Sequence, residues 1–201
     1  MRWIAGIVIL IATAIPVGAQ APPAQKTLPD YYPAKAGAKW TYDLDPGNGR
    51  KIRVTNQITR IETINGKAMA RLDTVINGRV IVTQHLLSTP EGVFRCRLSG
   101  SDVSPPLCFL KYPFKEGEAW KAEPVIGNEH SKMSFKSGSH EELKSAAAKY
   151  QAISVACEIN ADRAQIKIKS WYAPDIGMVK DVREFGDTTV TMELVSFEAG
   201  R

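Results

Sequence analysis

The residues that could carry out catalytic or metal chemistry are few and scattered along this chain. His85, His130 and His140 are not spaced from one another, or from a cysteine, as zinc ligands are. A hydroxyl lies beside an imidazole at 137–140, but neighbours in sequence do not make a catalytic triad, and no Gly-x-Ser-x-Gly elbow occurs. We therefore predict no catalytic residue, no metal site and no cofactor, and we do not expect an enzyme.

One stretch loosely resembles a calcium-binding loop, with Asp43, Asp45, Asn48 and Gly49 close together. A loop of the EF-hand type needs a carboxylate at its twelfth position. Counted from Asp43, that position is Val54, which cannot bind the ion. A hairpin turn rich in Asp, Asn and Gly explains these residues better.

The three cysteines, Cys96, Cys108 and Cys157, allow two interpretations. An exported protein meets an oxidising compartment, so a disulfide between Cys96 and Cys108 could form across a short loop. Alternatively, Cys96 and Cys157 are small buried residues, because both alternate with apolar neighbours. The sequence leaves both alternatives open.

Aromatic residues near the ends of expected strands are the candidates for ligand binding: Trp40, Tyr42, Trp120 and Trp171. Ligand pockets are lined mostly by apolar and aromatic side chains, so these residues could line a groove. The alternative is that each tryptophan caps the core of a β layer. Trp171 shares a strand face with two lysines, which predicts an exposed side chain and makes it the strongest of these binding candidates.

The pattern Y-P-x-K-x-G-x-x-W occurs twice, at Tyr32–Trp40 and again at Tyr112–Trp120. Five identities at the same spacing predict that one unit was duplicated. We expect a single β domain over residues 31–201, made of two related halves at 31–110 and 111–201.

The first residues have the features of a secretory signal peptide. A positive charge at Arg2 precedes an apolar run from Ile4 to Ile15, and Val17-Gly18-Ala19 supplies small residues for cleavage near Ala19. Residues 20–30 are rich in proline and predict a flexible leader. We therefore expect export to the periplasm or the extracellular space.

Charge and hydropathy exclude two classes of partner. The net charge is +5, but both signs are mixed along the chain, so no nucleic-acid-binding arm is expected. The N-terminal apolar run is shorter than the roughly 20 residues that span a bilayer. After cleavage, no transmembrane segment is expected in the mature chain.

Turn signals and alternating apolar residues predict an all-β antiparallel fold of about ten strands. Asn65-Gly66 and Asn77-Gly78 suit type I′ hairpin turns. A long strand at 51–64 loses its period of two near Ile61, which predicts a bulge. Residues 141–149 contain good helix formers without an apolar stripe, so we expect one short helix or a loop there. The strands should form one curved sheet, a half-open barrel or a sandwich.

Two motifs resemble a group of uncharacterised exported bacterial proteins that are rich in β structure. Residues 31–42 are similar to their opening motif, Y-x-P-L-x-x-G-x-x-W-x-Y, and residues 171–180 are similar to a later one, W-[YF]-A-P-G-x-G-x-V-K. The departures are Ala34, where leucine is usual, and Asp175, where glycine is usual. The resemblance covers most of the mature chain and implies an envelope protein, without an activity to transfer. At the level of fold only, such chains resemble the half-open barrels of periplasmic lipoprotein carriers.

Three hypotheses about function follow. The first is a non-catalytic envelope protein that binds a lipid-like, apolar or amphipathic ligand on a curved sheet lined by inward residues such as Ile52, Val54, Leu72, Val82 and Ile168. The second is a structural or protein-interaction module of the cell envelope, with a filled core and an exposed apolar patch around Trp171. A hydrolytic enzyme ranks third, because no cleft of convergent polar groups can be identified.

Overall fold

The computed structural model describes residues 29–145, 148–161 and 164–201, so the expected signal peptide and most of the leader lie outside the described residues. Every regular element in these ranges is a β-strand. No helix among the described residues is long and apolar enough to cross a membrane. The strands are β1 (Lys39–Asp45), β2 (Ile52–Ile64), β3 (Lys67–Ile76), β4 (Arg79–Thr89), β5 (Gly92–Leu98), β6 (Ser101–Lys111), β7 (Ala119–Ala122), β8 (Val125–Ile126), β9 (Glu129–His130), β10 (Lys132–Lys144), β11 (Lys149–Ala161), β12 (Ala164–Ala173), β13 (Gly177–Phe185) and β14 (Thr188–Glu198).

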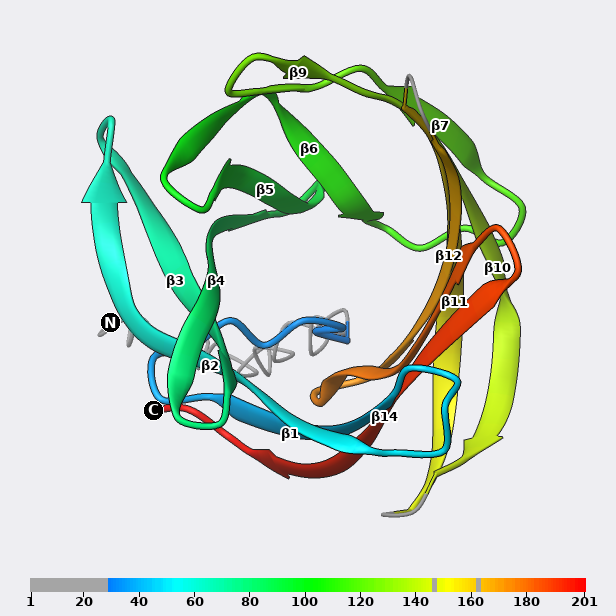
Figure 1. The fold of residues 1–201 in the computed structure, drawn as a ribbon. Coiled ribbons are helices and arrows are strands. Elements are labelled where there is room, and N and C mark those ends of the chain that lie inside the picture. Colours follow the sequence, from blue (N-terminus) through cyan, green and yellow to red (C-terminus); the bar gives the residue numbers. More distant parts are fainter. Residues whose placement is uncertain (1–28, 146–147, 162–163) are drawn as a thin grey trace, which may run out of the picture.

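The strands form one antiparallel sheet that rolls up without closing. Its order is β7-β10-β11-β12-β13-β14-β1-β2-β3-β4-β5-β6-β8-β9. Figure 1 looks along the roll, with β1 and β14 on one side and β6, β7 and β9 on the other. The prediction of an all-β curved sheet is confirmed.

The local turn signals are also confirmed. Asn65 and Gly66 have φ angles of 51° and 73°, and Asn77 and Gly78 have 50° and 74°. Two successive positive φ angles define the type I′ turn, which Asn-Gly tolerates at low steric cost. The predicted bulge in β2 lies between Ile58 and Arg60, where the pairing with β3 shifts register.

Two local predictions were wrong. Residues 141–144 extend strand β10 instead of starting a helix, because pairing with β11 outweighs their helix propensity. The number of strands was also underestimated, chiefly because β6 contains Pro105 and Pro106 and was not recognised. Proline is tolerated in strands that lie at an edge, and neither Pro105 nor Pro106 is paired with a residue of β5 or β8.

The sheet consists of two six-stranded meanders, β1–β6 and β7 with β10–β14, and the small hairpin β8–β9 is inserted in the second. The glycines of the two copies of the repeated motif take the same local geometry. Gly37 N donates to Ile58 O at 2.8 Å, and Gly117 N donates to Ser137 O at 3.0 Å. The two glycines have φ angles of 85° and 76°. A common origin of the two halves remains a prediction.

The two junctions between the meanders differ. β1 and β14 join by a continuous antiparallel ladder. No ladder between β6 and β7 is found among the described strands; instead Trp120 Nε1 donates to Cys108 O at 3.0 Å, and Lys111 Nζ lies 2.6 Å from Glu118 Oε1. The β8 strand also pairs with the start of β6. One side of the roll is therefore held by side chains and a short hairpin.

The segment that leads into β1, residues 29–38, crosses the inside of the roll (Figure 1) and closes one end of it. The Tyr32 ring lies 5.7 Å from that of Phe109 and 6.4 Å from that of Tyr172. Trp40 Nε1 donates to Ile176 O at 2.5 Å. The two motifs at 31–42 and 171–180, far apart in sequence, thus pack together as one closed end, which we call the floor.

Candidate ligand-binding cavity

A cavity of about 460 Å³ lies inside the roll, above the floor. That volume falls within the range of about 300–1,000 Å³ that is typical of small-molecule sites. Its walls are mostly aliphatic and aromatic and come from both meanders. Representative wall residues are Val54, Leu72, Val82, Leu107, Val155 and Ile168.

The wall residues face inward because side chains alternate between the two faces of a strand. On β3, Leu72, Thr74 and Ile76 line the cavity, while Asp73 between them points to the outer face and bonds there with Arg71. The same alternation holds for the predicted groove: Val54, Leu72, Val82 and Ile168 all line the cavity. Ile52 is the exception, because it is exposed at the start of β2.

The end of the roll opposite the floor is open and carries apolar side chains at its edge. The hairpins β1–β2, β3–β4 and β13–β14 all turn at this end. In the described part of the chain, four of the five exposed large apolar residues lie near these turns, and we call them the rim: Ile52, Val80, Ile81 and Phe185. Ile81 is 52% exposed and also lines the cavity, so the apolar walls continue into the rim.

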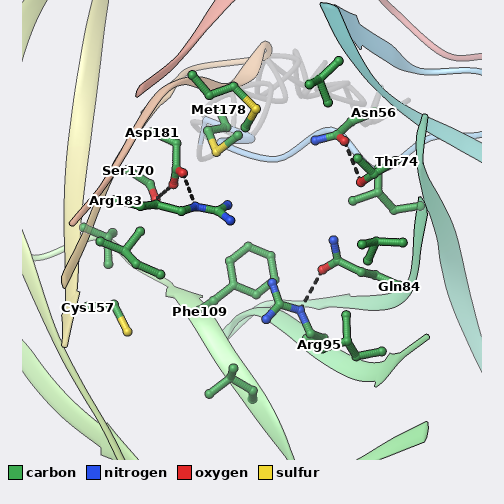
Figure 2. Close-up of a pocket in the computed structure, with 18 of the residues that line it drawn as sticks. Asn56, Thr74, Gln84, Arg95, Phe109, Cys157, Ser170, Met178, Asp181 and Arg183 are labelled. Carbon is green, nitrogen blue, oxygen red and sulfur yellow. Dashed lines mark hydrogen bonds and ion pairs between the residues drawn. The ribbon is translucent and has the colours of Figure 1, made fainter. Parts of the chain in front are cut away.

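A few polar side chains interrupt the apolar walls, and Figure 2 shows them pointing into the cavity. They form three hydrogen-bonded groups. Arg95 Nε donates to Gln84 Oε1 at 2.7 Å, and Thr74 Oγ1 donates to Asn56 Oδ1 at 2.8 Å. On the opposite wall, Asp181 accepts hydrogen bonds from Ser170 Oγ at 2.7 Å and from Arg183 Nε at 2.5 Å.

Burial governs the protonation of the groups around the cavity. It raises the pKa of the Tyr32 hydroxyl to about 12, although nearby Arg95 opposes the shift. It likewise raises the pKa of Tyr172, and it raises that of the Cys157 thiol to about 12. These groups stay neutral at physiological pH, so none of them supplies a nucleophile or a base.

The aromatic residues predicted to bind a ligand lie elsewhere in the fold. Trp171 is only 8% exposed, so its predicted exposure was wrong. Its indole lies under Lys169 and donates to Glu141 on the outer face of the roll. Trp40 and Tyr42 are buried in the floor, and Trp120 stacks at 5.2 Å on Phe135, its cross-strand neighbour in β10. None of the four lines the cavity.

The three cysteines are free thiols, so the disulfide between Cys96 and Cys108 that the sequence left open is not formed. Cys108 is paired with Phe94 across the β5–β6 ladder, and its sulfur packs beside Gly92. It therefore points along β5 away from Cys96. The alternative, that Cys96 and Cys157 are small buried residues, agrees with their burial.

The histidines do not gather into a site. His85 Nε2 lies 2.8 Å from Glu62 Oε2 on the outer face, and the His140 ring packs edge-on against Phe114. Within the described ranges, no group of three His, Cys, Asp or Glu side chains could hold a metal ion. A second hollow, of about 510 Å³, lies outside the floor and is bordered by Tyr31, Tyr112 and His140.

The polar residues of the cavity were missed by sequence reasoning, although a signal existed. In β13, Val179 is buried on the inward face, and Asp181 and Arg183 follow it at intervals of two residues. In β5, Arg95 likewise follows buried Val93. A charged residue on the otherwise apolar face of a strand indicates a polar site inside the fold. The signal can be used only when it is known which face of the strand points inward.

The fold resembles solved structures of low sequence identity. A candidate lipoprotein from Parabacteroides distasonis matches with a TM-score of 0.53 and 11% identity, over 86% of this chain and all of that one. A candidate exported protein with a YmcC-like fold from Bacteroides fragilis matches with a TM-score of 0.51 and 13% identity, over 85% of this chain and 99% of that one. No protein-family model matches the sequence. No curated protein sequence matches it either. The chain therefore shares a fold with these two proteins.

Proposed function

We propose that this protein is exported, with its signal peptide cleaved near Ala19, and that it holds an apolar or amphipathic ligand inside the rolled sheet without catalysing a reaction on it. The observation that carries the proposal is the cavity: its apolar walls continue at one end into the exposed rim. Burial of apolar ligand surface against such walls contributes roughly 25 cal/mol per Å² of binding free energy before the costs of association.

The sequence and the similar folds support export. The N-terminal residues carry the pattern of a cleavable secretory signal. The two proteins of similar fold are described as a lipoprotein and an exported protein. A location in the cell envelope or outside the cell suits a carrier of poorly soluble molecules.

A structural or protein-interaction role is the second hypothesis, and it has less support. It called for a filled core and an exposed apolar patch around Trp171. Trp171 is buried under Lys169, and the interior of the roll holds a cavity. The exposed apolar residues gather at the rim of that cavity instead.

The test is uptake of a hydrophobic fluorescent probe, N-phenyl-1-naphthylamine, by protein purified from the periplasm, together with native mass spectrometry for a lipid-sized adduct. Ile168→Trp narrows the cavity from its wall and should weaken uptake, because the larger side chain takes up part of the ligand space. Lys167→Trp adds the same side chain one residue earlier on the exposed outer face and should leave uptake unchanged. A clean monomer that takes up no probe would contradict the proposal.

A further inference from the structure

Arg95 places a positive charge in the cavity wall without an acidic partner. Among the described residues, its one hydrogen bond runs from Nε to the neutral Gln84 amide, and none of their ion pairs includes it. Its Cζ also lies 5.6 Å from the centre of the Phe109 ring. Arg95 is partly buried, and a charge that is withdrawn from water is ordinarily paired, because leaving it unpaired costs free energy. Within the described part of the chain, this guanidinium lacks a counter-ion.

A second guanidinium faces the same space. Figure 2 shows the side chains of Arg95 and Arg183 directed toward one another from opposite walls, with Phe109 between them. Arg183 is paired with Asp181, which is 3% exposed and is also held by Ser170. Among the described residues, Arg95, Asp181 and Arg183 are the charged side chains of the cavity lining, and together they carry one positive charge in excess.

The excess charge has an energetic cost in the empty cavity. Burial lowers the pKa of the Arg95 guanidinium, and the charge of Arg183 lowers it further. Both effects disfavour the charged form, yet an arginine side chain remains protonated at physiological pH. An anion in the cavity would remove this cost, and its carboxylate oxygens would match the fork of guanidinium N–H groups.

From this arrangement, and resting on the proposed function, we propose that the ligand is a single-chain amphiphile with a monoanionic head group such as a carboxylate, held by Arg95 and flanked by Arg183, with its hydrocarbon chain along the apolar walls. The cavity has the volume of about fifteen water-sized groups at roughly 30 Å³ each. That space suits a single acyl chain of medium length better than a lipid with two long chains.

The first experiment compares probes of one chain length on the unmodified protein: dodecanoate, dodecanol and dodecylammonium, each below its micelle-forming concentration, by isothermal titration calorimetry. Dodecanoate should bind about tenfold or more tightly than dodecanol, because a hydrogen bond to a charged group outweighs a neutral one. Dodecylammonium should bind most weakly. Acetate, an anion without a chain, should show no binding in the same concentration range.

The second experiment removes the charge at Arg95. Arg95→Met keeps an unbranched side chain and should lower the affinity for dodecanoate about tenfold while leaving dodecanol binding unchanged. Arg53→Met is the matched control, since Arg53 lies on the outer face of β2 and pairs there with Asp43. The comparison on the unmodified protein needs no variant, so the proposal stays testable even if Arg95→Met does not fold.

The outcomes separate this inference from the proposed function. If dodecanol binds as tightly as dodecanoate and Arg95→Met changes neither affinity, the inference of an anionic head group is wrong while the proposed carrier function stands. If Arg53→Met weakens dodecanoate binding as much as Arg95→Met does, the preference comes from overall charge and the inference fails. If none of the three long-chain probes binds, the proposed function fails as well.

Discussion

At the scale of the residue, position on the inner or outer face decides what a charged side chain does. Asp73 and Asp181 are both almost fully buried carboxylates. Asp73 lies on the outer face and is satisfied by Arg71, Thr59 and Thr83. Asp181 lies in the cavity wall, where it neutralises one of the two arginines. The first carboxylate supports the sheet and the second sets the charge of the site.

Asp73 should make stability depend on pH in the acid range. Burial would raise its pKa, but hydrogen bonds from Thr83, Arg71 and Thr59 outweigh burial and hold the pKa below 3.8. The contribution of the Asp73 carboxylate to the free energy of unfolding is therefore fully present above pH 3.8 and is lost as the pH falls below that value. We expect Asp73→Asn to lower the free energy of unfolding by about 2 kcal/mol at pH 7.

Urea denaturation of Asp73→Asn at neutral and acid pH measures both effects. The difference from the unmodified protein should shrink as the pH falls below 3.8. Asp102→Asn is the control, because the Asp102 side chain is 76% exposed and its ion pair with Arg97 is worth little. A constant difference between the Asp73 variant and the unmodified protein at all pH values would contradict this account.

At the scale of the element, the two meanders meet by a backbone ladder on one side and mainly by side chains on the other. Every residue of β1 is paired with a residue of β14. The corresponding edge of β6 is interrupted by Pro105 and Pro106, which have no N–H to donate. β7, the partner that β6 would need, is only four residues long.

Trp120 should therefore control how tightly the junction of β6 and β7 holds. Trp120→Phe removes the hydrogen bond to Cys108 O and should cost about 1 kcal/mol of stability. Hydrogen–deuterium exchange should rise in β6 and β7, since no ladder between them keeps the junction shut.

Trp40→Phe at the repeated position is the matched comparison. It loses a hydrogen bond to Ile176 O in the floor, but the ladder between β1 and β14 remains. Exchange in β1 and β14 should stay slow in this variant. Unchanged exchange in β6 and β7 of Trp120→Phe would show that its hydrogen bond does not hold the junction.

At the scale of the whole molecule, the cavity exists because a rolled sheet is closed at one end by its own N-terminal segment. The floor combines Tyr32 from that segment with Tyr172 from β12 and Phe109 from β6. These residues come from the start, the middle and the end of the described chain. The depth of the cavity, and with it the length of ligand that fits, is thus a property of the complete fold.

Tyr32→Ala should deepen the cavity. The loss of a buried aromatic ring should lower the free energy of unfolding by about 3–5 kcal/mol. The same change should shift the preferred chain length of saturated alcohols upward when decanol, dodecanol and tetradecanol are compared by native mass spectrometry. The exposed Lys35→Ala in the same segment is the control, and an unchanged length preference in Tyr32→Ala would place the chain end elsewhere.

Local chemistry in the sequence was enough to predict much of the sheet. Asn65-Gly66 and Asn77-Gly78 define their turns through backbone conformations that these residues tolerate, whatever lies around them. Alternation along β2, β3, β4 and β12 likewise identified four of the five expected groove residues. β6 was missed, because its prolines are acceptable only at an edge, and an edge is a property of the assembled sheet.

The sequence by itself determined which residues share a strand face, because a period of two is a local property of the backbone. It could not determine which face of each strand would be enclosed, since that depends on the curvature of the whole sheet and on pairings between distant strands. Only the tertiary structure buried Trp171 under Lys169, placed Trp40 in the floor, and brought Arg95 and Arg183 to the same cavity from opposite walls. The candidate site forms only when the sheet rolls up and brings the two meanders face to face, and no single segment of the sequence determines that curvature.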